Sequence, residues 1–226
     1  GLANHGWLIS RHTFSFASYY NPDRSNFGAL RVLNDDIVKP GQGFGTHPHD
    51  NMEIISIPIS GSLAHKDSTD NEKEIKTGEV QIMSAGSGIY HSEYNYSKTE
   101  EVNFLQIWIL PKERNITPRY DQKDFSVQLK DNQLITVVSP GVKDALWINQ
   151  DAELTLGKLK AGTSITHKLK FKNNGMYAFV IEGEAIVNNA NLNHRDAVGL
   201  FNNQKISINI IQDSTILLIE VPINYK

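Results

Sequence analysis

Residues 43–49 read Gly-Phe-Gly-Thr-His-Pro-His, and residues 83–93 read Met-Ser-Ala-Gly-Ser-Gly-Ile-Tyr-His-Ser-Glu. Side chains two residues apart on a β-strand point to the same face, so His47 and His49 lie side by side. His91 and Glu93 form a second pair of the same kind. Pro48 favours a strand at His47, because the residue before a proline is restricted to extended backbone. If the two strands are neighbours, about 4.8 Å apart, the four side chains converge on one point. The sequence therefore predicts one mononuclear metal site, since imidazole nitrogen and carboxylate oxygen both bind metals.

Strand patterns recur along the whole chain, whereas helical patterns are poor. Glycine, asparagine and proline separate the strands, as in sandwiches and barrels. The expected strands are Gly28–Leu33, Met52–Ile59, Glu79–Met83, Phe104–Leu110, Leu134–Val138, Leu154–Leu159, Tyr177–Ile181, Ile206–Ile211 and Ile216–Val221. The polar stretch Pro111–Lys123 carries two prolines and is expected to be a linker. The sequence predicts an all-β fold.

The two sides of this linker resemble each other. Ile57–Gly61 and Phe104–Pro111 align, in the same order, with Phe179–Gly183 and Thr215–Pro222. Self-similarity of this kind indicates a duplicated fold. We therefore predict an N-terminal metal-binding barrel over residues 1–130 and a C-terminal degenerate barrel over residues 131–226.

The alignment also predicts which residues occupy the ligand positions in the second barrel. Matching Gly61 to Gly183 sets Leu169 and Phe171 opposite His47 and His49, and matching Val80 to Val198 sets Asn209 and Ile211 near His91 and Glu93. The ligand positions become largely apolar. We expect the C-terminal barrel to bind no metal and to have a packed centre, with Leu169 and Phe171 buried.

The composition excludes several classes of protein. The chain has no cysteine, which rules out disulfides, thiolate metal sites and thiol nucleophiles. Its net charge is −3 and its pI about 6.3, so nothing draws it to nucleic acid or anionic lipid. No apolar run approaches the roughly 18 residues of a membrane span. We expect a cytoplasmic protein without a membrane or direct nucleic-acid partner. The chain begins at Gly1 rather than at methionine, so we expect further residues upstream.

A lone His-x-His pair is more often a surface pair than a metal site, but the flanking residues favour the metal. Gly41, His47, His49, Glu53 and Gly61 resemble the first motif of the cupin superfamily, and Gly78, Gly86, His91 and Asn95 resemble the second. Two departures are small. Seven residues rather than six separate Glu53 from Gly61, and Ser84 replaces a common proline.

More specifically, the chain resembles the pirin family of bicupins, closest to bacterial members described as quercetin 2,3-dioxygenases. The stretches that carry the resemblance are His12–Phe16, Gly43–His49, Met83–Glu93 and Gln106–Pro111. The resemblance implies two jelly-roll barrels and one metal, usually iron, held by three histidines and one glutamate in the N-terminal barrel.

The fourth ligand has two candidates, Glu53 and Glu93. Cupins at large use the position of Glu53, whereas pirins use that of Glu93. On a straight strand Glu53 would lie about 13 Å from His49, at roughly 3.3 Å per residue. Glu93 needs no bend to reach the site. We assign Glu93 as the ligand and Glu53 as a supporting or structural group.

The remaining candidates carry weaker signals. Five histidines lack a ligand partner two residues away and are interpreted as hydrogen-bonded or exposed: His5, His12, His65, His167 and His194. Gln106 and Trp108 share a strand face and could line a cavity, although Trp108 is interpreted first as a core residue.

Three nitrogens and one oxygen suit Fe(II), Mn, Co, Ni or Cu, with Zn also possible. The resemblance implies a dioxygenase that opens a flavonol such as quercetin with O2 and releases carbon monoxide, with Glu93 as the catalytic base. Two alternatives stay open. One is a metal-sensing or redox-sensing regulator that acts through a protein partner, and the other is a metallo-isomerase or sugar-binding cupin.

Overall fold

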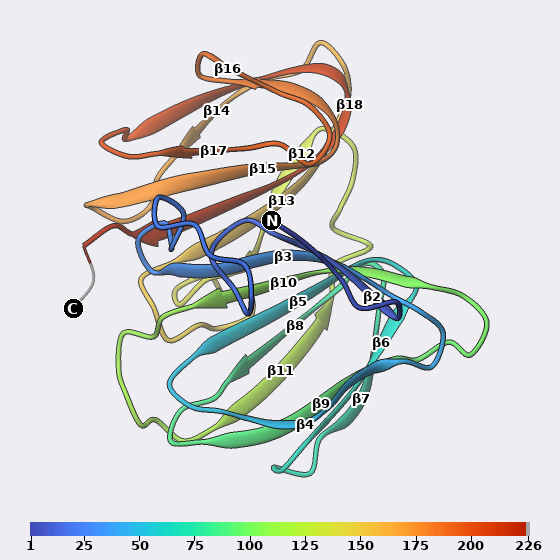
Figure 1. Ribbon diagram of the computed structural model, residues 1–226. Helices are drawn as coiled ribbons and strands as arrows, with labels where there is room; N and C mark the ends of the chain where they lie inside the picture. Colours follow the sequence, from blue (N-terminus) through green and yellow to red (C-terminus); the bar gives the residue numbers. More distant parts are fainter. Residues whose placement is uncertain (225–226) are drawn as a thin grey trace. The chain divides into compact units, whose positions relative to one another are not determined.

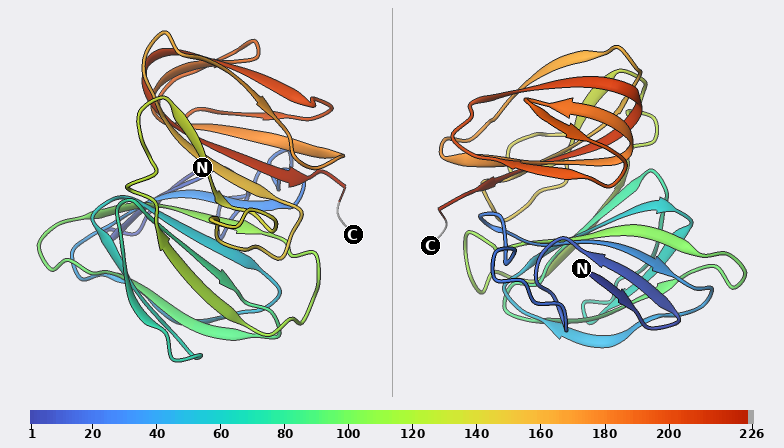
Figure 2. Two further views of the ribbon diagram at one scale, coloured as in Figure 1. Left: turned by 180° about the vertical axis from the view of Figure 1, so that it is seen from behind. Right: turned by 45° about the horizontal axis from the view of Figure 1, so that its top comes forward.

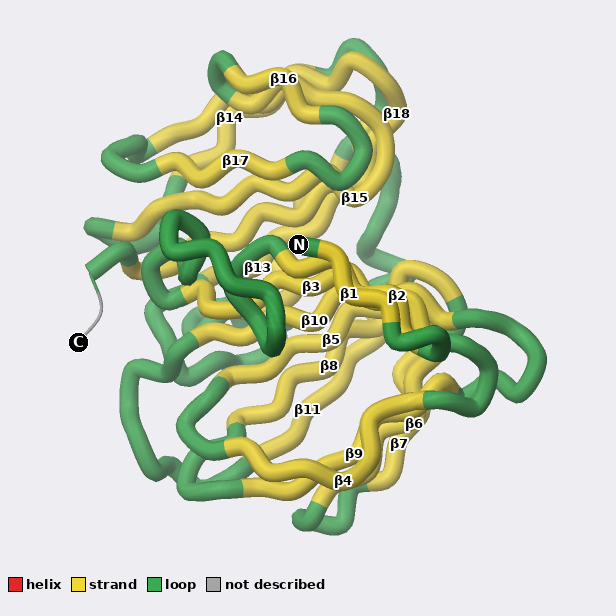
Figure 3. Tube along the Cα trace, in the orientation of Figure 1, coloured by secondary structure: helices red, strands yellow, loops and turns green. Residues whose placement is uncertain are grey.

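The structure, a computed structural model, describes residues 1–224, and every regular element in that range is a β-strand (Figures 1 and 3). The all-β prediction is therefore confirmed. Within the described residues, no helix is present that could cross a membrane.

The backbone contacts divide the chain into two compact units. The N-terminal unit comprises Gly1–Asn26 and Leu30–Asp124, and the C-terminal unit comprises Phe27–Ala29 and Phe125–Lys226. The functional division at residues 130 and 131 stays a prediction.

The N-terminal unit contains two antiparallel sheets, which face each other in Figure 2. The larger sheet has the order β1 (Leu2–Asn4), β2 (Leu8–His12), β3 (Leu30–Val38), β10 (Val102–Ile109), β5 (Glu53–Ser60), β8 (Glu79–Ser84) and β11 (Arg119–Asp124). The smaller sheet has the order β4 (Gly43–His49), β9 (Ile89–Asn95), β6 (Ser62–Asp67) and β7 (Glu72–Lys76). The predicted linker is thus partly wrong, because residues 119–124 form a strand paired with β8.

A row of polar side chains crosses the middle of the larger sheet. Gln106 of β10 pairs with Asn34 of β3 on one side and with Ser56 of β5 on the other, and Asn34 pairs in turn with His12 of β2. Residues directly opposite one another in a sheet project from the same face. This register brings polar groups from strands far apart in sequence to the inner face of the unit, where Gln106 meets Glu93 of the smaller sheet.

The C-terminal unit is built around two long strands. Its sheet has the order β12 (Gln133–Val138), β13 (Glu153–Leu159), β18 (Lys205–Pro222), β15 (Asn174–Val187) and β16 (Ala190–Leu192), with β14 (Ser164–Lys168) on β18 and β17 (Ala197–Leu200) on β15. The two strands expected over Ile206–Ile211 and Ile216–Val221 are one continuous strand. Irregularities in the β15–β18 pairing bend this ladder.

These irregularities shift the alignment of the two halves. With Gly61 matched to Gly183, Leu63 corresponds to Ala185. Leu63 pairs with Asn95, and Ala185 pairs with Ile210, so Asn95 corresponds to Ile210. Moving back along both strands, Glu93 corresponds to Ile208 and His91 to Ile206. The predicted counterparts Ile211 and Asn209 are wrong by three residues, and Ile211 is 49% exposed.

The counterparts of His47 and His49 in the second half change as well. His47 pairs with His91, and His167 pairs with Ile206, so His167 is the counterpart of His47. Leu169 then corresponds to His49, and Phe171 to neither histidine. Leu169 and Phe171 are half-buried rather than fully buried. Leu169 packs against the core, whereas the Phe171 ring lies 5.6 Å from the Lys170 ammonium.

The centre of the C-terminal unit is apolar and packed. Ile206 and Ile208 are 1% and 0% exposed and belong to a core cluster with Ile210, Met176 and Leu218. Three of the four counterpart positions, all except His167, therefore carry aliphatic side chains. That this unit holds no metal stays a prediction, and the packing supports it.

Candidate metal centre

The strands β4 and β9 position the candidate ligands by direct pairing. His47 lies opposite His91, as the sequence predicted for two neighbouring strands. Gly43, at the start of β4, permits this approach. A Cβ atom there would lie 2.3 Å from the backbone oxygen of Glu93, closer than any side chain can be placed. The glycine is required because the two backbones meet at that point.

Three histidines converge on one point of the inner face, and we call His47, His49 and His91 the histidine cluster. Each offers a ring nitrogen within 4.8 Å of the other two. The Nε2 atoms of His47 and His91 are 3.0 Å apart. The Nδ1 atom of His47 lies 2.7 Å from the Gly45 carbonyl oxygen, which can accept its proton and leave Nε2 with a free lone pair. This orientation is the one that a metal ligand needs.

Burial keeps the imidazoles of His49 and His91 neutral. Desolvation, followed by the neighbouring His91 and His47, lowers the pKa of His49 to about 4. Desolvation, followed by His47 and His65, lowers the pKa of His91 to about 3. Neutral rings whose lone pairs face one another repel unless a cation lies between them. The donor set therefore fits a divalent metal ion.

Glu93 lies beside the histidine cluster but belongs to a second group of close donors, with His91 and His65. It is 3% exposed. Its Oε1 accepts a hydrogen bond of 3.0 Å from Ser56 Oγ, and its Oε2 accepts one of 2.7 Å from Gln106 Nε2. Gln106 Oε1 also accepts from Ser56 Oγ at 3.2 Å. The carboxylate is thus held in place by two strands of the opposite sheet.

Glu53 lies away from these donors. It is 1% exposed and accepts a hydrogen bond of 2.8 Å from Ser84 Oγ. Glu53 lies three residues before Ser56, the β5 residue that reaches Glu93. Because side chains alternate along a strand, Glu53 faces the other side of the sheet. Among the described residues, neither group of close metal-binding donors includes Glu53. The geometry agrees with Glu53 as a structural residue.

His65 is a buried residue whose surroundings the sequence did not indicate. Its Nε2 lies 2.9 Å from Asp67 Oδ2, and both side chains are fully buried. Its ring centroid is 5.4 Å from that of His91 and 4.7 Å from that of Tyr120. Asp67 also accepts hydrogen bonds from Thr69 and Asn71, which holds His65 behind His91.

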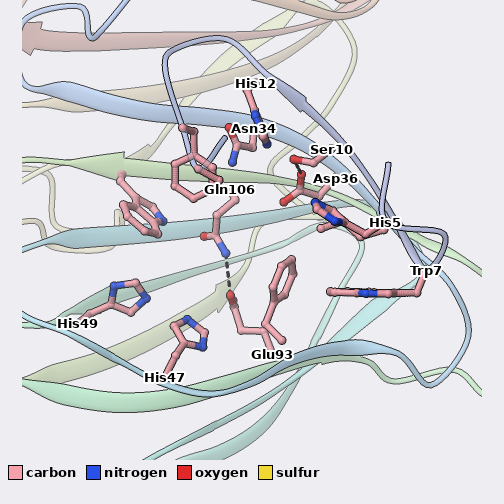
Figure 4. A pocket seen from close by; sticks show the side chains of 15 residues that line it. His5, Trp7, Ser10, His12, Asn34, Asp36, His47, His49, Glu93 and Gln106 are labelled. Atoms are coloured by element: carbon pink, nitrogen blue, oxygen red, sulfur yellow. Dashed lines mark hydrogen bonds between the residues drawn. The ribbon is translucent and has the colours of Figure 1, made fainter. Parts of the chain in front are cut away.

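A cavity of about 380 Å³ opens beside the histidine cluster. Figure 4 shows His47, His49 and Glu93 on one side of it, with the Gln106 side chain reaching down to Glu93. Aromatic rings form much of the wall. Trp7 packs edge-on against Phe44, and Phe16 packs edge-on against Trp108. Trp108 packs against the core residues Ile54 and Met83 and also lines the cavity, where its ring centroid lies 4.9 Å from that of His49, so it is more than the plain core residue that was predicted.

The opposite side of this cavity is polar, which the sequence did not predict. We call Ser10, His12, Asn34 and Asp36 the polar wall; each is at most 5% exposed and each lines the cavity. Ser10 Oγ donates to Asp36 Oδ1. Burial raises the pKa of Asp36 to about 7, against the hydrogen bond from Ser10 and with help from Asp35 and Glu93. The alternation of Asn34 and Asp36 on a strand was the only available signal.

The jelly-roll units and the histidine cluster define this chain as a bicupin. Comparison with known families places it more narrowly. The Pirin family matches residues 1–109, and the quercetinase C-terminal cupin domain matches residues 136–221. The quercetin 2,3-dioxygenase of Escherichia coli K12 is 44% identical over 223 residues, which cover 98% of this chain and 95% of that protein. The chain belongs to the pirin family.

One further relative and one solved structure agree with this assignment. A pirin-like protein of Caulobacter vibrioides is 40% identical over 222 residues, which cover 97% of this chain and 95% of that protein. The solved structure of the E. coli bacterial pirin YhhW in complex with nickel(II) is 43% identical, with a TM-score of 0.92 over 98% of this chain and 95% of the other.

Proposed function

We propose that this pirin is a metal-dependent quercetin 2,3-dioxygenase, with one divalent metal held by His47, His49, His91 and Glu93. The observation that carries the proposal is the convergence of three imidazoles, with ring nitrogens within 4.8 Å of one another, at the edge of an aromatic cavity. The names of the relatives and the nickel(II) complex of the E. coli protein support it. Fe(II) is the metal we expect, from the family resemblance and the mixed nitrogen and oxygen donors.

The cavity supports a flavonol as substrate. Its volume of about 380 Å³ is within the usual range of roughly 300 to 1,000 Å³ for small-molecule sites. Two edge-to-face pairs, Trp7 with Phe44 and Phe16 with Trp108, offer flat apolar surfaces to a planar ring system. A sugar-binding cupin would instead be expected to present mostly polar walls around its ligand.

The side chains would bind the substrate and move one proton. The reaction consumes a flavonol and O2 and yields a ring-opened ester and carbon monoxide, so that both oxygen atoms enter the ester. The metal would supply Lewis-acid and redox chemistry. Glu93 would take the proton of the 3-hydroxyl as a general base. Ser56 and Gln106 would fix the orientation of Glu93, and Trp108 would hold the rings beside His49.

The test is turnover of quercetin by protein of known metal content, measured as O2 consumption together with carbon monoxide release. Glu93→Gln should abolish turnover and weaken metal retention, because the site loses one of four ligands. Glu53→Gln is the matched control, since it is a buried glutamate on the other face of the sheet, and it should keep both metal and turnover. Fully metal-loaded wild-type protein without turnover would contradict the dioxygenase proposal and favour the regulatory alternative.

A further inference from the structure

The polar wall has no place in the chemistry described above. Its four side chains come from two neighbouring strands in direct register, with Ser10 opposite Asp36 and His12 opposite Asn34. Figure 4 shows them grouped across the cavity from His47 and His49, with the Asn34 amide turned towards the cavity. The cavity therefore has two chemically different sides. One carries the histidine cluster and Glu93, and the other carries the polar wall.

Some buried hydrogen-bonding atoms of the polar wall have no partner in the part of the protein that the structure describes. Within the described residues, neither Asn34 Oδ1 nor His12 Nδ1 has a hydrogen-bond partner, although both atoms are buried. Buried polar atoms are nearly always paired, so exceptions point to a missing partner. Asp36 is 4% exposed, and Ser10 Oγ donates to its Oδ1. An aspartate, an asparagine and a histidine can all accept hydrogen bonds, and the last two can also donate them.

We propose that Asn34 and Asp36, supported by Ser10 and His12, form a specificity subsite for phenolic hydroxyl groups at the end of the ligand remote from the metal. This inference rests on the proposed function, because it takes the ligand to be a flavonol. Trp108 contacts His49, and Phe16 contacts both Trp108 and His12, so aromatic rings extend from the histidine cluster to the polar wall. A planar ligand packed on them would lie between the two. Its chelating hydroxyl would face the histidines, and hydroxyls on its distant ring would donate to Asp36 and Asn34.

Hydrogen bonds of this kind discriminate strongly, because a ligand without the hydroxyls leaves buried polar groups unpaired. Quercetin carries two hydroxyls on its B ring, the ring that we place at the polar wall. Galangin has the same chelating group and the same fused-ring hydroxyls, but its B ring is unsubstituted. We expect the wild-type protein to bind quercetin at least about tenfold more tightly than galangin, which corresponds to about 1.4 kcal/mol.

The experiment compares the dissociation constants of quercetin and galangin by calorimetry under nitrogen, with the full chain loaded with zinc. Asn34→Leu and Asp36→Asn should each bring the ratio of the two constants to within about threefold of unity, mainly by weakening quercetin. Asp35→Asn is the matched control, because Asp35 precedes Asp36 on β3, faces the other side and bonds Asn103 instead. It should keep the wild-type ratio.

A wild-type ratio near unity, a ratio unchanged in both variants, or no binding of either flavonol would overturn the subsite. The proposed reaction has its own readout in O2 consumption by the iron-loaded protein. If the ratio collapses as expected but no O2 is consumed, the subsite stands and the dioxygenase proposal fails. If O2 is consumed equally with quercetin and galangin and the ratio is unity, the dioxygenase stands and the subsite fails.

Discussion

Asp36→Asn should stabilise the folded protein, and the gain should grow with pH. Burial raises the pKa of Asp36 from 3.8 to about 7. A raised folded-state pKa means that the folded protein holds this proton more tightly than the unfolded chain does. The cost of the buried carboxylate is absent below about pH 4, increases as the pH rises to about 7, and is constant above that. Asparagine keeps the shape and an acceptor for Ser10 but carries no charge.

The magnitude follows from the shift in pKa. A shift of roughly 3 units, at about 1.36 kcal/mol per unit, gives on the order of 4 kcal/mol at pH 8. At pH 5, only about 1 to 2 kcal/mol of this remains. For a chain of this size the gain at pH 8 corresponds to a rise in Tm of about 10 °C.

The assay is thermal or urea unfolding of wild-type and variant protein at pH 5 and pH 8, with matched metal content. Ser10→Ala provides the opposite control, because it removes the hydrogen bond that opposes the rise in the pKa of Asp36. This variant should lose more stability at pH 8 than at pH 5. An equal effect of Asp36→Asn at both pH values, or destabilisation at both, would refute the argument, because Asp36 would then be ionised and fully satisfied in the fold.

Three further outcomes follow from the geometry. Metal-free protein should lose stability as the pH falls below about 6.5 towards 4. The folded-state pKa values of His49 and His91 are lowered to about 4 and about 3, so the unfolded chain binds protons first. Urea titrations with and without bound metal measure this, and stability independent of pH over that range would contradict it. Gly43→Ala should separate β4 from β9 and reduce metal content, because the added Cβ would meet the Glu93 backbone; an unchanged metal content would show that the close approach is dispensable. Ile208→Ala should cost about 2 to 5 kcal/mol of stability without changing the metal content, whereas Phe171→Ala should cost less because Phe171 is half-buried. The Tm of each variant and elemental analysis test this. A loss of metal in Ile208→Ala would contradict the assignment of Ile208 to a packed core without metal.

Local sequence pattern was enough for the fold class and the histidine cluster. His47, His49 and His91 are adjacent in space because each pair lies on one strand and the two strands are neighbours, which alternation and the intervening turn both indicate. The partners of Glu93 were less accessible. Ser56 and Gln106 reach it from β5 and β10 through a register that only the folded sheet defines.

The alignment of the two halves failed for a different reason. The bulges between Val180 and Ala185 change the count of residues along β15 and β18. A sequence alignment without gaps cannot include such bulges, so the predicted counterparts were displaced by two or three residues. The corrected positions on β18 are still apolar, because its neighbouring inward-facing residues Ile206, Ile208 and Ile210 are all isoleucine. The polar wall was missed because Ser10 and Asp36 meet only through the pairing of β2 with β3.

The most direct test of a single metal held by the histidine cluster and Glu93 is elemental analysis of purified protein beside the double variant His47→Ala, His49→Ala. We predict close to one transition metal per chain in the wild type and close to none in the variant, with the variant still folded. Two metals per wild-type chain, or full metal content in the folded double variant, would contradict the account.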